Sequence, residues 1–258
     1  MALILTSNGL QSIPQEVLPG LLQAWGRPIE NAVVVLDACR DYTAGGHTDQ
    51  MAHKYEGARS AESYAEDYIA GMREDIEVLS MYSSNIACVH FYRLQAIDGV
   101  DASPENVEQA VREMITYEGS EATARRSPEE LKAIVSNADF IWVCGGCPYG
   151  CMVSLRERPE LWFEIVHNVR NNRAIYGGRS AGSILAGNEL HGFALSILWR
   201  ANRAATKKEE SRALRLLDKM VVPHFGGRGE NTVRKDVRGY KGEADEVQIR
   251  DGEWKLFY

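Results

Sequence analysis

The sequence predicts an α/β fold, in which a doubly wound, mostly parallel sheet is sandwiched by helices and followed by a C-terminal β-hairpin. Short apolar runs alternate along the chain with segments of helical periodicity, and most of these runs are apolar throughout, as in strands covered on both faces. An Asp-Gly pair between the last two apolar runs favours a tight hairpin. The 258 residues are 45% hydrophobic, which suffices for a full core, and no linker or fixed-period repeat interrupts them. We therefore expect a single domain over residues 1–258.

Apolar runs mark the strands in order. The runs expected to build the sheet are residues 2–6, 32–37, 86–90, 140–144, 174–177 and 220–223. Parallel strands need right-handed crossovers, which the intervening helices supply. Residues 247–249 and 254–257 flank the predicted hairpin turn at Asp251-Gly252.

Helical stripes and N-terminal capping signals mark the helices. Apolar residues at helical spacing begin near residues 13 and 64, and Pro104 and Pro159 each stand at a first helical position. Ser127 and Glu130 form a capping box ahead of another helix. Residues 39–57 are polar and predicted to be a long loop, whereas residues 192–219 follow neither pattern.

Charge and cysteine content exclude several classes of protein. The net charge is -7, which argues against a nucleic-acid surface, because such a surface needs a concentrated basic face. No segment resembles a signal peptide or a membrane span. Five cysteines, an odd number without an export signal, favour a reduced protein, and we expect a cytoplasmic location.

The pentapeptide GRSAG at residues 178–182 carries the strongest functional signal. It follows an apolar run and precedes a helical segment, which predicts a sharp strand-to-helix turn with Ser180 at its apex. Such a turn exposes the hydroxyl at the edge of a sheet and directs the first N–H groups of the helix towards its target. A G-x-S-x-G sequence alone favours an ordinary strand-to-helix loop, and only the other segments at the same edge reverse that preference.

Two further segments end strands at the same predicted edge. A serine hydroxyl needs a base within hydrogen-bond reach and N–H donors for the oxyanion. His224, just after the run at 220–223, is the candidate base. The backbone amides of Gly146, after the run at 140–144, and of Ala181 are the candidate oxyanion donors.

These segments resemble the peptidase E family of serine dipeptidases, whose relatives include cyanophycinases. The resemblance rests on LILTSNGL at residues 3–10, IWVCGG at 141–146, AIYGGRSAG at 174–182 and VPHF at 222–225, in the family's order. It implies a fold related to class I glutamine amidotransferases, with serine in place of the cysteine nucleophile. It also implies hydrolysis of short peptides, often those that begin with Asp, without a cofactor.

The chain departs from the family pattern in three places. Cys147-Pro148 follows the Gly-Gly pair, so one backbone donor is lost there, and the loop at 39–57 looks longer than in relatives. Relatives carry an acid between the serine and the histidine, but residues 193–198 contain none. Glu189 is the best substitute for this third triad member. Loss of the orienting carboxylate would lower the rate by about 10⁴-fold.

Other candidate sites receive less support. Cys144, Cys147 and Cys151 have a spacing that invites a metal, but no fourth ligand lies nearby, so we expect no metal and no cofactor. Arg179 is a candidate for binding a substrate carboxylate, and an exposed arginine is an equal alternative.

Two classes of function remain open. The first is a serine peptidase that acts on a small peptide, and the second is a catalytically silent relative that binds a peptide or amino acid or serves in an assembly. A cysteine-dependent amidotransferase-like activity is disfavoured because the turn carries serine. The expected partner is the peptide substrate, with no nucleic acid or membrane, and a homodimer stays open.

Overall fold

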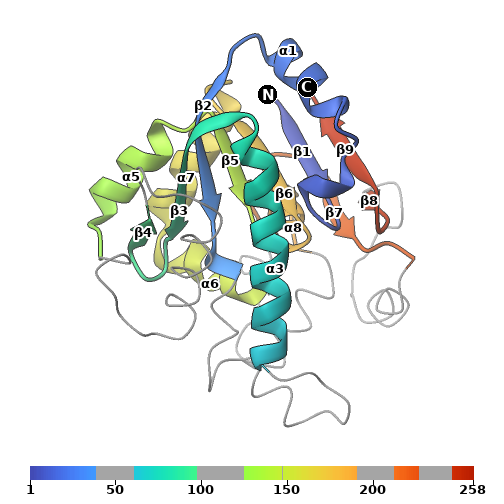
Figure 1. The fold of residues 1–258 in the computed structure, drawn as a ribbon. Helices are drawn as coiled ribbons and strands as arrows, with labels where there is room; N and C mark the ends of the chain where they lie inside the picture. The colour runs from blue at the N-terminus through green and yellow to red at the C-terminus, as the bar shows by residue number, and fades with distance from the viewer. Residues whose placement is uncertain (39–60, 98–124, 147, 191–211, 227–245) are drawn as a thin grey trace, which may run out of the picture.

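The computed structural model of the chain describes residues 1–38, 61–97, 125–146, 148–190, 212–226 and 246–258, and its fold is drawn in Figure 1. A seven-stranded sheet forms its centre, with the strand order β4-β3-β2-β5-β6-β1-β9. All pairs among the five inner strands are parallel, whereas the edge strands β4 and β9 are antiparallel to their neighbours. The strands are β1 Leu3–Thr6, β2 Ile29–Val35, β3 Ser83–His90, β4 Gln95–Ile97, β5 Phe140–Val143, β6 Ile175–Arg179 and β9 Trp254–Phe257. The predicted α/β fold with a mostly parallel sheet is confirmed.

A second, two-stranded sheet lies beside the first. It pairs β7 Met220–Pro223 with β8 Glu246–Ile249 in parallel. The turn that joins β8 to β9 is present as predicted, with the N–H of Glu253 bonded to the carbonyl of Arg250 and Gly252 at φ 79°. The two strands nevertheless pair with different partners, β8 with β7 and β9 with β1. The turn therefore connects the small sheet to the edge of the large one.

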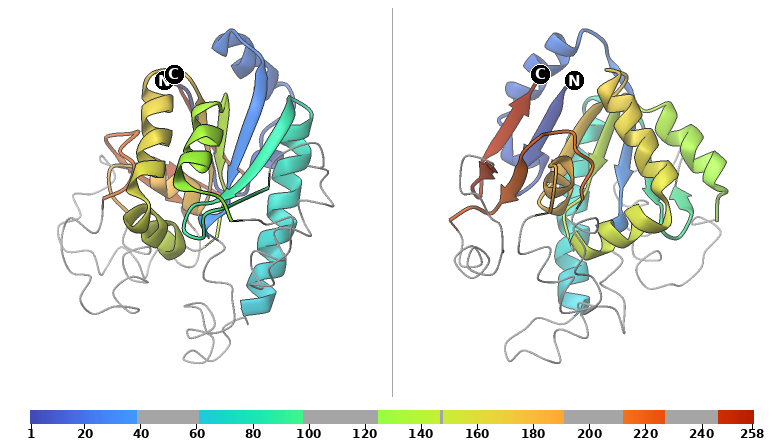
Figure 2. Two further views of the ribbon diagram at one scale, coloured as in Figure 1. Left: turned by 90° about the vertical axis from the view of Figure 1, so that its left-hand side faces the viewer. Right: turned by 180° about the vertical axis from the view of Figure 1, so that it is seen from behind.

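Helices cover both faces of the large sheet (Figure 2). The long helix α3 lies on one face, and α5 and α7 lie on the other. The helices are η1 Leu10–Ser12, α1 Val17–Trp25, α3 Ala61–Ser80, α5 Pro128–Ser136, α6 Pro148–Glu157, α7 Pro159–Arg170 and α8 Ala181–Ala186. None of the described helices is long and apolar enough to cross a membrane.

The capping signals act as expected. Ser127 Oγ accepts a hydrogen bond from the N–H of Glu130, whose carboxylate accepts one from the N–H of Ser127. Pro159 stands at the start of α7. The helix expected after Pro104, the loop at 39–57 and most of the segment at 192–219 lie outside the described residues.

The core is built around large aromatic side chains between the sheet and its helices. Trp142, Trp162, Tyr176 and Phe91 are fully buried, and Phe91 meets Trp162 edge to face with ring centroids 5.3 Å apart. Gly177 on β6 leaves room for Trp142 on the adjacent β5, since a Cβ there would lie 2.3 Å from the indole ring. These contacts fix β5 against β6, the two strands whose ends bear the candidate site.

Candidate active site

Ser180 stands at the turn between β6 and α8 in an unusual backbone conformation. Its φ of 47° and ψ of -103° lie outside the regions that a residue with a side chain prefers. The turn is tight, because a Cβ on Gly182 would lie 2.0 Å from the carbonyl oxygen of Val143. The N–H of Ser180 donates to the carbonyl of Thr6 at 3.0 Å, which holds the turn against the end of β1. The strained serine conformation fits a nucleophile presented at a sheet edge.

His224 brings its ring to the Ser180 hydroxyl. The residue follows β7 directly, and its Nε2 lies 3.0 Å from Ser180 Oγ. The backbone at His224 also has a positive φ, 56°, which turns the ring out of the line of the strand. The distance is that of a hydrogen bond, and it is what a base that accepts the serine proton requires.

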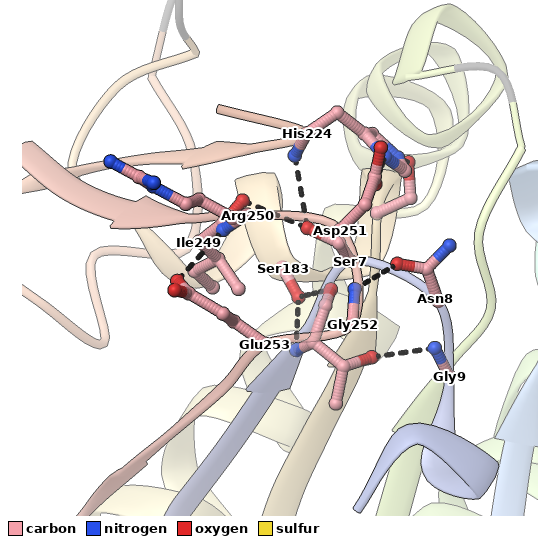
Figure 3. Close-up of polar contacts among 12 residues, drawn as sticks. Ser7, Asn8, Gly9, Ser183, His224, Ile249, Arg250, Asp251, Gly252 and Glu253 are labelled. Atoms are coloured by element: carbon pink, nitrogen blue, oxygen red, sulfur yellow. Dashed lines mark hydrogen bonds and ion pairs between the residues drawn. The ribbon is translucent and has the colours of Figure 1, made fainter. Parts of the chain in front are cut away.

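Asp251 faces the other nitrogen of the same ring. Its Oδ1 lies 2.5 Å from His224 Nδ1. Figure 3 marks this contact with a dashed line. A proton on Nδ1 that points at this carboxylate leaves Nε2 free to accept from the Ser180 hydroxyl. The structure thus lines up a hydroxyl, an imidazole and a carboxylate in a Ser-His-Asp arrangement.

Glu189, the acid expected beside His224, lies elsewhere. It follows α8, and its backbone forms an isolated antiparallel bridge with Arg212. No contact joins it to His224, so the expectation is corrected in favour of Asp251. The sequence analysis did not predict Asp251, because the resemblance implied an acid between Ser180 and His224, and Asp251 follows both of them. The usable signal was a carboxylate next to a turn glycine, two residues after the end of a predicted strand.

The two candidate oxyanion donors stand at the ends of neighbouring strands, Gly146 after β5 and Ala181 directly after Ser180. Gly146 follows β5 with φ at 129°, and Ala181 begins α8. Within the described residues, neither amide N–H has a hydrogen-bond acceptor. Both Gly146 and Ser180 line one cavity of about 400 Å³, a size suited to a small ligand.

Arg179 and Asp75 lie together in the wall of this cavity. Arg179 Nη1 is 3.5 Å from Asp75 Oδ2, and the arginine side chain keeps 22% of its surface exposed. Asp75, on α3, is fully buried and accepts hydrogen bonds from the N–H of Leu10 at 2.7 Å and from Trp142 Nε1 at 2.9 Å. Burial raises the pKa of Asp75 to about 6, against the opposing effects of the Arg179 charge and the two hydrogen bonds.

The described cysteines do not form a second reactive centre. Cys88, Cys144 and Cys151 are buried free thiols. Burial raises the pKa of Cys88 to about 12 and that of Cys144 well above its ordinary value, so neither ionises readily near neutral pH. Among the described residues, no group of His, Cys, Asp or Glu side chains is arranged to hold a metal ion. Cys147 lies outside them.

Solved structures with this fold include proteins described as peptidases. A candidate peptidase E protein from Listeria monocytogenes EGD-e matches with a TM-score of 0.56 and 15% identity, covering 99% of this chain and 93% of that one. A peptidase from an acI-B1 Actinobacterium matches with a TM-score of 0.51 and 16% identity, covering 99% and 86%. At this identity the likeness concerns the fold.

A family comparison extends the likeness to sequence. No curated protein sequence matches the chain. The model of peptidase family S51, however, matches residues 95–255, which is more than half of the chain and includes Ser180, His224 and Asp251. The chain therefore belongs to peptidase family S51.

Proposed function

We propose that the protein is a serine peptidase that hydrolyses short peptides through an acyl-enzyme. Membership of family S51 supports a peptidase. The observation that carries the mechanism is the continuous series of contacts from Ser180 Oγ through the His224 ring to Asp251.

The proposed reaction has two steps. Ser180 Oγ attacks the carbonyl carbon of the scissile bond while His224 Nε2 takes its proton. The C–N bond then breaks as His224 passes that proton to the leaving amine. Water, deprotonated by His224, attacks the resulting ester and releases the acid, which regenerates the serine hydroxyl.

Three further groups have supporting roles in this proposal. Asp251 holds the proton on Nδ1 and stabilises the imidazolium that forms during each step. The N–H groups of Gly146 and Ala181 donate to the oxyanion. The reaction so written uses only protein groups and water, and needs no metal or cofactor.

We further propose that the preferred peptides carry an acidic group next to the scissile bond, as in peptides that begin with Asp or β-linked Asp. Arg179 directly precedes the nucleophile and lines the same cavity. A guanidinium has five N–H donors, and the ion pair with Asp75 leaves several of them for a substrate carboxylate.

The alternative function is a catalytically silent relative. It was favoured by the lack of an acid between Ser180 and His224 in the sequence. The contact between Asp251 and His224 removes that argument and supports the peptidase.

A dipeptide panel combined with covalent labelling tests the proposal. Peptides with Asp, β-linked Asp, Glu and neutral first residues are assayed with the wild type, with Ser180→Ala, and with Ser80→Ala, which alters an exposed serine at the end of α3. We expect turnover, and a fluorophosphonate adduct mapped to Ser180, in the wild type and in Ser80→Ala alone. Flat traces across the panel, with no adduct at Ser180, would establish the binding or assembly alternative.

A further inference from the structure

Three consecutive residues at the end of β1 each hold the backbone of one part of the Ser-His-Asp arrangement. The carbonyl of Thr6 accepts from the N–H of Ser180 at 3.0 Å. Ser7 Oγ accepts from the N–H of His224 at 2.9 Å. Asn8 Oδ1 accepts from the N–H of Gly252, the residue after Asp251, at 2.8 Å.

These contacts connect residues that belong to two different sheets. Ser180 follows β6 of the large sheet, whereas His224 and Asp251 follow β7 and β8 of the small sheet. No strand of one sheet pairs with a strand of the other, so the ladders do not set the distance between serine and histidine. Helix α8 packs beside β7, and β9 pairs with β1, so the two sheets also meet there. The end of β1 differs from these contacts in that it hydrogen-bonds the backbone of Ser180 and of His224 directly.

Ser7 is well suited to this bridging role. Its side chain is buried, with 1% of the residue exposed, and it donates to the carbonyl of Ile249 at 2.9 Å while it accepts from His224. Ile249 is paired with Pro223 in the small sheet. One hydroxyl therefore fastens the ends of both β7 and β8 to β1.

Asn8 fixes the turn that carries Asp251. Its Oδ1 points at Gly252, and its Nδ2 points away from the turn (Figure 3). The Asp251 side chain is 63% exposed, so packing alone does little to hold it. The carboxylate must nevertheless stay within hydrogen-bond reach of His224, and the bond to Asn8 restrains the adjacent backbone.

We infer that Ser7 and Asn8 are positioning residues for catalysis, Ser7 acting through His224 and Asn8 through Asp251. This inference rests on the proposed function. Neither residue needs to take part in bond making. A catalytic group displaced by about 1 Å can lose roughly 10²-fold in rate, which sets the scale of the effect.

The test measures the chemistry and the His224 ring separately. The rate of fluorophosphonate labelling at Ser180 reports nucleophile activation without requiring a known substrate. The proton NMR signal of the His224 Nδ1–H reports its contact with Asp251, because a hydrogen bond to a carboxylate moves that signal downfield. The variants are Asn8→Ala, Asn8→Asp, Ser7→Ala, Asp251→Asn and the Asn8→Ala/Asp251→Asn double variant. Ser12→Ala is the control, because it removes a hydrogen bond to the carbonyl of Gly9 in the same loop.

We expect Asn8→Ala to slow labelling by roughly tenfold or more and to move the Nδ1–H signal of His224 in the same direction as Asp251→Asn does. Asn8→Asp keeps an acceptor for Gly252 and should restore most of the labelling rate. The double variant should label no more slowly than Asp251→Asn alone, because Asn8 acts through that carboxylate. Ser7→Ala should slow labelling while Ser12→Ala matches the wild type.

Failure of this inference can be told from failure of the proposed function. If the wild type is not labelled at Ser180, or Asp251→Asn leaves the Nδ1–H signal of His224 unchanged, the proposed mechanism itself is wrong. If those two results hold but Asn8→Ala and Ser7→Ala behave like Ser12→Ala, the positioning role is wrong. Additive losses in the double variant would likewise make Asn8 a general stabiliser of the fold.

Discussion

Arg179 Nη1 lies 3.5 Å from Asp75 Oδ2, and this ion pair joins the residue before Ser180 to helix α3 on one face of the sheet. The separation exceeds the usual length of a charge-assisted hydrogen bond, so the arginine is restrained without being fully engaged. Gly71, one helical turn before Asp75, lies directly under the guanidinium, since a Cβ there would come within 2.2 Å of Nη1. Helix α3 thus both attracts the arginine and leaves space for it.

Removal of the Arg179 charge should change substrate selection more than chemistry. We expect Arg179→Gln to lower kcat/KM for peptides with an acidic first residue by roughly 10- to 100-fold, the value of a charge-assisted hydrogen bond. Neutral peptides should change by less than about threefold on the same grounds. The measurement is the ratio of the two kcat/KM values in each protein. Equal losses for both peptide classes would assign Arg179 to the architecture of the turn instead.

A single methyl group added to α3 at Gly71 should displace the Arg179 side chain. Gly71→Ala places a Cβ where the guanidinium lies and should reproduce the selectivity loss of Arg179→Gln, although Gly71 carries no functional group. Gly20→Ala is the matched control, because it adds a Cβ to α1 with nothing within 4 Å. The control should raise the free energy of unfolding by about 0.5–1 kcal/mol through helix propensity and leave selectivity unchanged. The prediction fails if Gly71→Ala keeps the wild-type preference.

Asp75 should make stability depend on pH. Its folded pKa is about 6 against an ordinary value of 3.8, so the folded protein binds the extra proton between these two pH values. The contribution is therefore complete below about pH 4 and is lost as the pH rises through 6. Relative to Asp75→Asn, the wild type should lose about 2 kcal/mol of unfolding free energy between pH 4 and pH 7. Urea denaturation of both proteins at each pH measures this difference, and parallel pH profiles would contradict it.

Local signals explain which features the sequence predicted well. The run at 220–223 became β7 with the predicted bounds, and the Ser127 capping box formed as expected, because each depends on neighbouring residues alone. The Ser180 turn was also recognisable, since glycines mark the close approach of Gly178 to the backbone of Gly182.

Pairing between distant segments explains what was missed. The partners of β8 and β9 are set by β7 and β1, far away in the chain, so the last two strands read as a simple hairpin. Asp75 resembles any polar residue on an amphipathic helix until Trp142 and Leu10 are seen to bond it. Its position next to the apolar Ile76 on a stripe that includes Met72 was the available hint.

The carboxylate beside His224 provides the sharpest comparison, because the sequence and the structure favour different residues. Asp251 lies 2.5 Å from His224 Nδ1, whereas the backbone of Glu189 is bridged to Arg212 at the other end of α8. Asp251→Asn preserves the shape of the side chain but allows the wrong imidazole tautomer, in which Nε2 carries the proton and cannot accept from Ser180. We expect it to lower kcat by up to about 10⁴-fold with little change in KM.

Glu189→Gln is the matched control for that experiment, since it removes the same charge by the same isosteric change. It should retain kcat within about threefold, because no contact joins Glu189 to the ring. Circular dichroism of both variants must first match the wild type, so that a loss of rate is not a loss of fold. A large fall in kcat for Glu189→Gln, together with a small fall for Asp251→Asn, would show that Glu189 and not Asp251 is the carboxylate that supports His224. If both variants keep the wild-type rate, Ser180 and His224 act as a dyad, and the exposed Asp251 pair contributes little because solvent screens it.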